Sequence, residues 1–303
     1  METDIQELKL NLRQSNIKYV KVAITDIDGV LRGKYMHVDK FLKSIESGYG
    51  FCDVIFGWDS SDDLYEFKIS DKQNLFTGWH TGYPDQTVRI ILDSQRTIPF
   101  ERNTPFFLSE LKDGEVCPRN ALKKALKLLK ELGFKGKSAL EYEFFLFNET
   151  PHSVREKDFQ NLISFTPGMF GYSLLRSSVH SELFQEILEL CESMDLPLEG
   201  LHTETGPGVL EAAIAADETL NSADKAVLFK TFMKVLAQRK NLMATFMAKW
   251  SEKYPGQSGH VHCSLMDLEN PYGNGHAAKQ IVDVLQNIEL TKELIQKEIC
   301  YDI

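Results

Sequence analysis

The first third of the chain alternates apolar and polar side chains over short runs, which is the spacing of β-strands. Such runs cover residues 19–25, 30–36 and 88–93, and an Asp-Gly turn between the first two predicts a hairpin. An amphipathic pattern predicts a helix over residues 4–16, and Asp39 is expected to cap a second, short helix. This part of the chain is therefore expected to form strands joined to two helices.

The rest of the chain combines helical spacing with further strand patterns. Prolines at positions 99 and 105 interrupt regular structure between the two parts, so we expect one domain over residues 1–104 and a second over residues 105–303. The predicted fold class is α+β, with a largely antiparallel sheet and flanking helices in the second domain. Its helices are expected over residues 118–132, 179–194 and 221–240, and its strands over residues 139–147, 245–250 and 259–265.

A tight turn is the feature around which the second domain is organised. Gly206-Pro207-Gly208 makes the chain reverse, because proline fixes φ and glycine adopts conformations barred to other residues. Glu204 and Glu211 lie on either side of this turn, and Glu211 is flanked by apolar residues. A carboxylate on an apolar background costs several kcal/mol unless a cation meets it, and a bound metal ion is the usual solution. The alternative is an acidic hairpin at the surface.

Two further strand patterns carry side chains that bind metals. Alternate residues of a strand point the same way, so Glu141 and Glu143 share one face of their strand, and His260 and His262 share one face of theirs. Each pair alone is a weak signal, since a single buried histidine is more often satisfied by a backbone carbonyl. Combined with the two glutamates of the turn, they predict a two-metal site for Mg²⁺ or Mn²⁺ of the kind that handles nucleotide phosphates.

Composition narrows the function classes. The net charge is −10, from 34 Lys and Arg against 44 Asp and Glu, so the chain has no overall field for holding nucleic acid or an anionic membrane. No apolar run approaches the roughly 20 residues of a bilayer span, and the N-terminus lacks the profile of a signal peptide. Five cysteines without a Cys-x-x-Cys spacing indicate free thiols in a reducing compartment, so we expect a cytoplasmic protein.

Several segments carry recognisable motifs. They are Asp28–Lys34, Gly82–Asp85, Glu141–Leu146, His202–Glu211, Phe246–Lys249 and Ser258–Leu265. In this order along the chain they resemble the motifs of the glutamine synthetase family, and most closely its type I branch with the γ-glutamyl-amine ligases. The resemblance covers about residues 15–268. It implies an N-terminal β-grasp domain followed by a glutamine synthetase catalytic domain.

The resemblance also implies an ATP-dependent ligase. In that family ATP phosphorylates the γ-carboxylate of glutamate at Mg²⁺ or Mn²⁺, and ammonia or a small amine displaces the phosphate. Each active site forms between one subunit's catalytic domain and its neighbour's N-terminal domain, so we expect a ring-like homo-oligomer. By position, the resemblance implies that the metal nearest glutamate would be bound by Glu143, Glu204 and Glu211, and the metal at the ATP phosphates by Glu141 and His260. The nucleotide would contact Glu199, His262 and Ser264, and the amino acid would contact the loop at Gly256. The ammonium ion would be bound by Asp53, or else by Asp59, Asp62 or Asp63.

Two departures from the family pattern matter. The loop at residues 255–259 lacks the asparagine of the usual Asn-Gly pair, and no counterpart of the family's Asn-Ser-Tyr-Lys-Arg motif or of its phosphate-clamping arginines follows residue 265. An amphipathic helical tail is expected over residues 277–303 instead. We therefore expect the chain to bind metal and nucleotide better than it turns over substrate. A non-catalytic structural or regulatory subunit of the same family is the main alternative.

A phosphatase of the haloacid-dehalogenase type is a second alternative. Residues 22–25 form an apolar run that leads into Asp26-Ile27-Asp28-Gly29, in which Asp26 would be the covalent nucleophile. That chemistry also needs an acidic Mg²⁺ pair after several more strand–helix units, and no such pair follows in the sequence.

Overall fold

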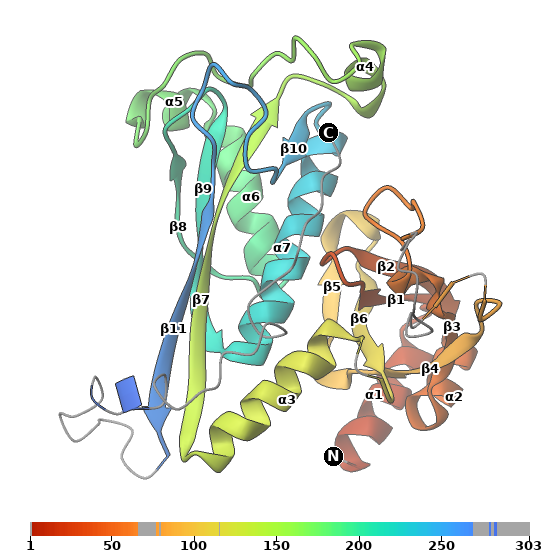
Figure 1. Ribbon diagram of the computed structural model, residues 1–303. Helices are drawn as coiled ribbons and strands as arrows, with labels where there is room; N and C mark the ends of the chain where they lie inside the picture. The colour runs from red at the N-terminus through yellow and green to blue at the C-terminus, as the bar shows by residue number, and fades with distance from the viewer. Residues whose placement is uncertain are drawn as a thin grey trace.

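The computed structural model describes residues 2–65, 77–78, 80–114, 116–268, 279 and 282–283. Its described strands form two sheets, each with helices packed against it (Figure 1). The α+β fold class is therefore confirmed. The helical tail expected over residues 277–303 lies, for the most part, outside the described residues.

The first sheet has the strand order β2-β1-β6-β4-β3, and β5 also pairs with β6. Strand β1 runs parallel to β6 and the other pairs are antiparallel, which gives the mixed sheet expected of a β-grasp domain. The elements are α1 (Glu2–Gln14), β1 (Tyr19–Thr25), β2 (Leu31–His37), α2 (Val38–Ser47), β3 (Tyr49–Cys52), η1 (Asp53–Phe56), β4 (Asp85–Ile90), η2 (Leu92–Ser94), β5 (Arg96–Ile98), η3 (Pro99–Glu101) and β6 (Thr104–Leu111).

Some expected boundaries differ in this part of the chain. The cap of α2 is His37, whose Nδ1 accepts a hydrogen bond from the backbone N–H of Asp39 at 3.3 Å, so Asp39 lies inside the helix and does not cap it. Strand β6 pairs with both β1 and β4, so the first sheet continues to Leu111. The domain division expected at residue 104 falls at the start of this strand. The division itself stays a prediction, and the pairing favours placing it after β6.

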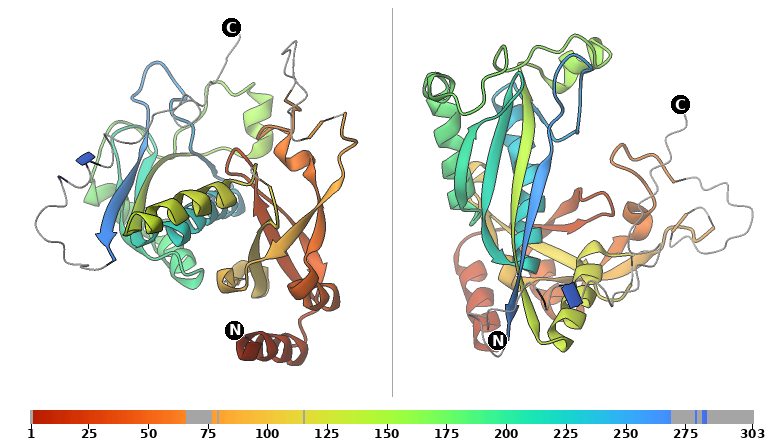
Figure 2. Two further views of the ribbon diagram at one scale, coloured as in Figure 1. Left: turned by 60° about the horizontal axis from the view of Figure 1, so that its bottom comes forward. Right: turned by 60° about the vertical axis from the view of Figure 1, so that its left-hand side comes forward.

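The second sheet has the order β10-β7-β9-β8, with β11 also paired to β7, and every pair is antiparallel. Figure 2 (right) shows its long strands side by side, with helices behind them. The elements are α3 (Pro118–Glu131), β7 (Phe134–Phe147), α4 (Pro151–Glu156), α5 (Leu174–Val179), α6 (Ser181–Ser193), β8 (Leu198–Thr203), β9 (Val209–Glu218), α7 (Thr219–Arg239), β10 (Met243–Thr245) and β11 (Gly259–Asp267).

The strand expected over residues 245–250 is wrong beyond its first residue. Strand β10 ends at Thr245 because it shares one edge of β7 with β11, which takes over that edge at Tyr142. The chain leaves the sheet there. The ring of Phe246 turns into the core and lies 5.4 Å from the ring of Tyr142 and 5.2 Å from that of Phe144.

One hydrophobic core joins the two sheets. Helix α7 packs between them, and its Phe232 lies edge-on to Phe106 of β6 at 6.0 Å between ring centroids (Figure 1). On the second sheet, Phe229 of the same helix packs against Phe144 of β7. Burying a side chain of this size contributes about 1.5–3 kcal/mol to folding. This core fixes the sheet face that α7 covers and leaves the opposite face open.

A buried ionic network also connects the two parts. Glu110 of β6 is 1% exposed and accepts hydrogen bonds from Arg89 of β4, from Arg119 of α3, and from Lys123 at 2.8 Å. Arg119 in turn contacts Asp224 of α7 at 3.1 Å. Burial raises the pKa of Glu110, but hydrogen bonds from the three cations outweigh this effect and hold the pKa below its ordinary value of 4.5.

Asp26 orders the turn between β1 and β2. Its buried carboxylate accepts hydrogen bonds from the backbone N–H groups of Asp28 (2.9 Å) and Val30 (2.8 Å), and from Nε of Arg32 (2.8 Å). A covalent nucleophile must reach its substrate, whereas this carboxylate is fully enclosed and already paired. The geometry therefore excludes the phosphatase alternative and gives Asp26 a structural role.

We expect Asp26→Ala to destabilise the protein by about 3 kcal/mol, because the substitution leaves the backbone N–H groups of Asp28 and Val30 without this acceptor and removes the buried partner of Arg32, which keeps its exposed pair with Asp62 and the Asp59 carbonyl. Urea denaturation followed by circular dichroism measures the change. Asp113→Ala is the control, since Asp113 is exposed, and should change stability by no more than about 0.5 kcal/mol. Equal stabilities for the two variants would contradict a structural role for Asp26.

Candidate metal-binding site

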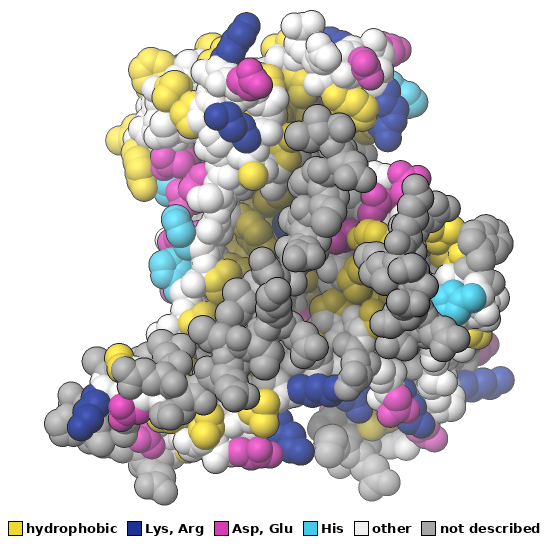
Figure 3. Space-filling view, in the orientation of Figure 1, with side chains coloured by type: hydrophobic (Ala, Val, Ile, Leu, Met, Phe, Trp, Pro, Cys, Tyr) yellow, Lys and Arg dark blue, Asp and Glu magenta, His cyan; other side chains and the backbone are white. Residues whose placement is uncertain are grey.

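The open face of the second sheet carries the metal-binding side chains predicted from the sequence. Tyr142 and Phe144 of β7 point into the core beneath α7, so Glu141 and Glu143, which alternate with them, point to the opposite face. Figure 3 shows histidine and carboxylate side chains gathered along one edge of this part of the molecule. Among the described residues they form two clusters.

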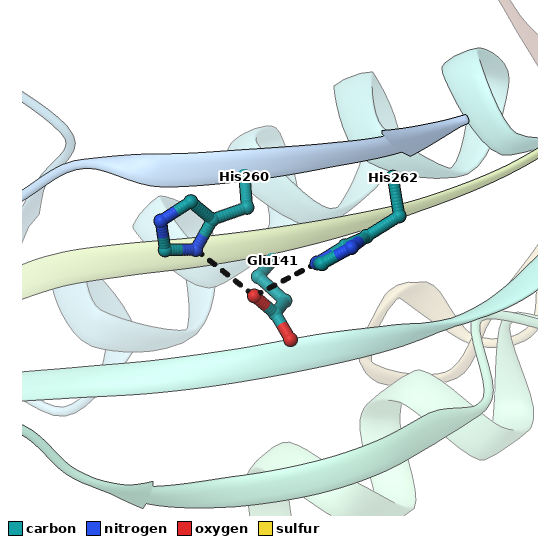
Figure 4. A group of neighbouring side chains, drawn as sticks. All are labelled: Glu141, His260 and His262. Carbon is teal, nitrogen blue, oxygen red and sulfur yellow. Dashed lines mark hydrogen bonds and ion pairs between the residues drawn. The ribbon is translucent and has the colours of Figure 1, made fainter.

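The first cluster joins Glu141 to His260 and His262 (Figure 4). His260 is the register partner of Glu141 across β7 and β11. Its Nδ1 lies 3.0 Å from Oε2 of Glu141, and Nε2 of His262 lies 3.1 Å from the same oxygen. The hydrogen bond from His262, and a further one from His260, lower the pKa of Glu141 against the opposing effect of burial. One carboxylate and two imidazoles thus converge at the sheet surface.

The second cluster lies beside the turn between β8 and β9. His202 of β8 places Nδ1 3.8 Å from Oε2 of Glu204 and Nε2 3.7 Å from Oε2 of Glu211. Tyr172 stacks on the His202 ring at 4.2 Å between ring centroids. Burial raises the pKa of Glu211, His202 opposes this, and the neighbouring glutamates add to it. The raised pKa therefore reflects chiefly the burial of this carboxylate, to which the charges of Glu141, Glu143 and Glu204 add.

The turn itself has the tight geometry predicted from the sequence. Gly208 has a φ of +73°, and a Cβ atom there would lie 2.4 Å from the carbonyl oxygen of Leu146. Only glycine fits this position, and the turn is thereby packed onto the end of β7. The side chains of Glu204 and Glu211 are 18% and 13% exposed, so the alternative of an acidic surface hairpin is wrong.

Glu143 is held by the loop that precedes β11. Its carboxylate accepts hydrogen bonds from the backbone N–H of Ser258 at 2.9 Å and from the Ser258 hydroxyl at 3.4 Å. Across β7 and β9, Glu143 is the register partner of Glu211. It therefore lies on the same face as the two clusters, with Ser258 fixing its orientation.

His202 was not predicted from the sequence as a member of the site. The signal was available, because His202 precedes Glu204 by two positions and side chains two apart share one face of a strand. The structure also pairs His262 with Glu141, whereas the family resemblance placed His262 at the nucleotide. Both roles can hold together, since an imidazole beside a metal ligand also lies beside whatever that metal binds.

Other predicted site residues lie outside the two clusters. Glu199 is exposed at an irregularity in the pairing of β8 with β9, Ser264 is exposed on β11, and Gly256 lies in the loop before β11. A Cβ at Gly256 would lie 2.6 Å from the carbonyl oxygen of Ala248, so the loop passes close to that backbone. The nucleotide and substrate roles of these three residues stay predictions.

The side chain of Asp53 lies inside the part of the molecule that is built on the first sheet. Asp53 is 1% exposed, and its carboxylate accepts hydrogen bonds from the Thr77 hydroxyl at 2.6 Å and from Nε2 of Gln86 at 3.4 Å. Of the other loop aspartates, Asp62 forms an ion pair with Arg32, and Asp59 accepts hydrogen bonds from backbone N–H groups within its own loop. The ammonium role given to Asp53 stays a prediction, and the carboxylate is enclosed in this structure.

The donor set suits a hard or borderline divalent cation. Each cluster offers three ligand atoms that lie within 4.8 Å of one another, from carboxylate oxygens and imidazole nitrogens. Four glutamates share the same sheet face, and like charges at such spacing repel each other unless a cation intervenes. The residues present therefore fit Mg²⁺ or Mn²⁺ and leave room for additional ligands from a substrate.

Residues 115–288 match the family described as glutamine synthetase, catalytic domain. The chain is 48% identical over 263 residues to type-1 glutamine synthetase 2 of Dictyostelium discoideum, covering 85% of this chain and 49% of that protein. It is 34% identical to a glutamate–isopropylamine ligase of a Pseudomonas species, covering 85% of this chain and 56% of that protein. The chain thus spans about half the length of these relatives.

The fold also matches solved structures. The structure of GmaS without ligand superposes with a TM-score of 0.69 at 21% identity, covering 87% of this chain and 57% of that one. A Plasmodium falciparum glutamine synthetase gives a TM-score of 0.64 at 19% identity, with 87% and 53% covered. In the described part of the chain, no helix has the length and apolar content needed to cross a membrane. The described cysteines are all free thiols.

Proposed function

Because this chain belongs to the glutamine synthetase family, we propose that it takes part in ATP-dependent formation of an amide at the γ-carboxylate of glutamate. The observation that carries the proposal is the pair of carboxylate–imidazole clusters on one open sheet face. Two divalent cations bound there would supply the positive charge that a phosphoryl transfer between anionic reactants requires.

In this proposal the residues of the chain have separate roles in binding the cations and the substrates. Glu204 and Glu211, with Glu143 beside them, would hold one cation, on the side of the amino acid, and Glu141 and His260 would hold a second, on the side of the nucleotide. His202 supplements the first set, and the stacked ring of Tyr172 fixes its orientation. Glu199, His262 and Ser264 contact the nucleotide, and the loop at Gly256 contacts the amino acid.

The nitrogen donor in our proposal is ammonia or a small amine. Relatives named as a glutamine synthetase and as an isopropylamine ligase both match 85% of the chain. The loop between α4 and α5 brings the aromatic side chains of Phe170 and Tyr172 to this end of the sheet, where they are 56% and 70% exposed. Such surfaces suit a donor with a short alkyl group as well as ammonium itself.

We also propose that the protein works as a homo-oligomer with ring-type contacts. Helix α5 presents Leu174, Leu175 and Val179 at 81%, 76% and 69% exposure, an unusual concentration of apolar surface. It lies beside Tyr172 and hence beside the second cluster. A second copy of the chain packed on α5 would cover this surface next to the site.

The test measures phosphate release by the purified protein with Mn²⁺, ATP, glutamate and either ammonium chloride or isopropylamine. We expect release to require glutamate and one of the two nitrogen donors, and to fall by at least about 100-fold in Glu211→Gln. Phosphate release that does not depend on glutamate would overturn the ligase proposal. Manganese-dependent ATP binding without release for any donor would favour the non-catalytic alternative.

A further inference from the structure

A pocket of about 460 Å³ lies between the two parts of the molecule, away from the metal-binding face. One wall is the turn between β1 and β2, at residues 29–31, and the other is the C-terminal half of α7, with Lys230, Lys234, Gln238 and Arg239. The sheet face beneath α7 is the one opposite the metal clusters, so this pocket belongs to a different surface from the proposed active site.

The charge of this pocket is unlike that of the chain as a whole. The chain carries a net charge of −10, yet the residues that line the pocket include three cations and no carboxylate. Lys230 and Lys234 have no ion-pair partner among the described residues. Their ammonium groups instead lie over the ring of Phe246, at 5.9 and 6.0 Å from its centroid.

The positive charges of Lys230 and Lys234 repel each other. They are four residues apart on one helix, so they project from the same face, where like charges are destabilising. Burial and the neighbouring Lys230 lower the pKa of Lys234. Arg239 is better compensated, since its guanidinium lies 4.8 Å from the ring centroid of Phe100 and also lies near Glu101. Burial raises the pKa of Glu101, but Lys21 and Tyr35, with a smaller effect from Arg239, lower it. The positive charge of the pocket that lacks a nearby negative charge is therefore that of Lys230 and Lys234.

We propose that this pocket binds a small anionic metabolite through its carboxylate or phosphate group, with Lys230 and Lys234 as the charged donors. Gln238 offers a neutral amide to the same ligand. Val30, Leu31 and Val235 are the apolar side chains of the lining and suit a short carbon skeleton. The ligand would touch both walls, and hence both parts of the molecule.

The experiment is isothermal titration calorimetry of the full chain at low ionic strength, without divalent metal, with succinate and inorganic phosphate as separate probes. We expect saturable binding of at least one probe, weakened tenfold or more in Lys234→Met and in Lys230→Met. Lys127→Met is the matched control, because Lys127 lies on the exposed face of α3 and its one ion-pair partner among the described residues is Glu131. It should bind the probe as the parent does.

Succinate binding alone identifies a carboxylate ligand, and phosphate binding alone identifies a phosphorylated one. Absence of saturable binding for both probes would overturn the proposal, as would unchanged affinity in both lysine variants. If a variant fails to fold, chemical acetylation of lysines in the parent protein tests the proposal instead. The bound probe should reduce acetylation of Lys230 and Lys234 and leave that of Lys127 unchanged. Equal labelling of all three with and without probe would also overturn it.

Discussion

Glu141→Gln is expected to weaken Mn²⁺ binding by on the order of 10- to 100-fold, the range seen when a metal site loses a supporting group. Glu141 is the anionic member of its cluster, and both histidines approach the same carboxylate oxygen. An amide presents a neutral oxygen and a competing N–H group, so the cation would lose charge compensation while the strands stay paired. Calorimetric titration with Mn²⁺ measures the effect, and thermal melting should show a smaller metal-induced rise in Tm.

The matched control for this prediction is Glu192→Gln, an exposed glutamate on α6, which packs on the other face of the sheet. It removes the same charge from the chain and should leave Mn²⁺ affinity unchanged. Glu211→Ala tests the second cluster in the same way. If Glu141→Gln and Glu211→Ala both bind Mn²⁺ as the parent does, the metal site is wrongly placed.

Glu110→Ala should destabilise the protein by about 3–5 kcal/mol, the usual cost of removing one partner from a buried ionic group. The substitution leaves Arg89, Arg119 and Lys123 converging on a site without its carboxylate. Urea denaturation measures the loss. Glu131→Gln is the control, because its exposed pair with Lys127 is 3.9 Å long and contributes no more than about 0.5 kcal/mol.

The same network predicts a pH dependence of stability. Because its partners hold the pKa of Glu110 below 4.5, the stabilisation is complete above that value and is lost as pH falls through the lower folded-state pKa. The parent should therefore lose stability below about pH 4.5 more steeply than Glu110→Ala does. Parallel pH profiles for the two proteins would show that Glu110 is not the group responsible.

Much of the site could be predicted because strand periodicity is local. The alternation of Glu141 with Tyr142 and of His260 with Val261 was enough to decide which side chains share a face. Periodicity does not, however, predict the register in which one strand pairs with another. That His260 lies opposite Glu141, with His262 reaching the same oxygen, depends on how β11 aligns along β7.

The roles of the buried acids could not be predicted for the same reason. Asp26 stands in a sequence that also fits a phosphatase nucleophile, and only its enclosure and its contact with Arg32 reveal a structural role. The partners of Glu110 include Arg119, which itself reaches Asp224, 105 residues further along the chain. Local patterns contain no information about contacts at that separation. The enclosure of Asp53 was likewise not predicted, since it depends on Thr77 and Gln86, which lie 24 and 33 residues further along the chain.

The pairing of β7 with β11 also determines when the first cluster can exist during synthesis. Glu141 precedes His260 by 119 residues, and ribosomes add about 5–20 residues per second, so the carboxylate waits roughly 6–24 s for its imidazole partners. During that interval one edge of β7 has no neighbour along residues 134–142, and unpaired strand edges are where chains associate wrongly. The strand that completes the metal site is thus also the strand that protects the nascent sheet.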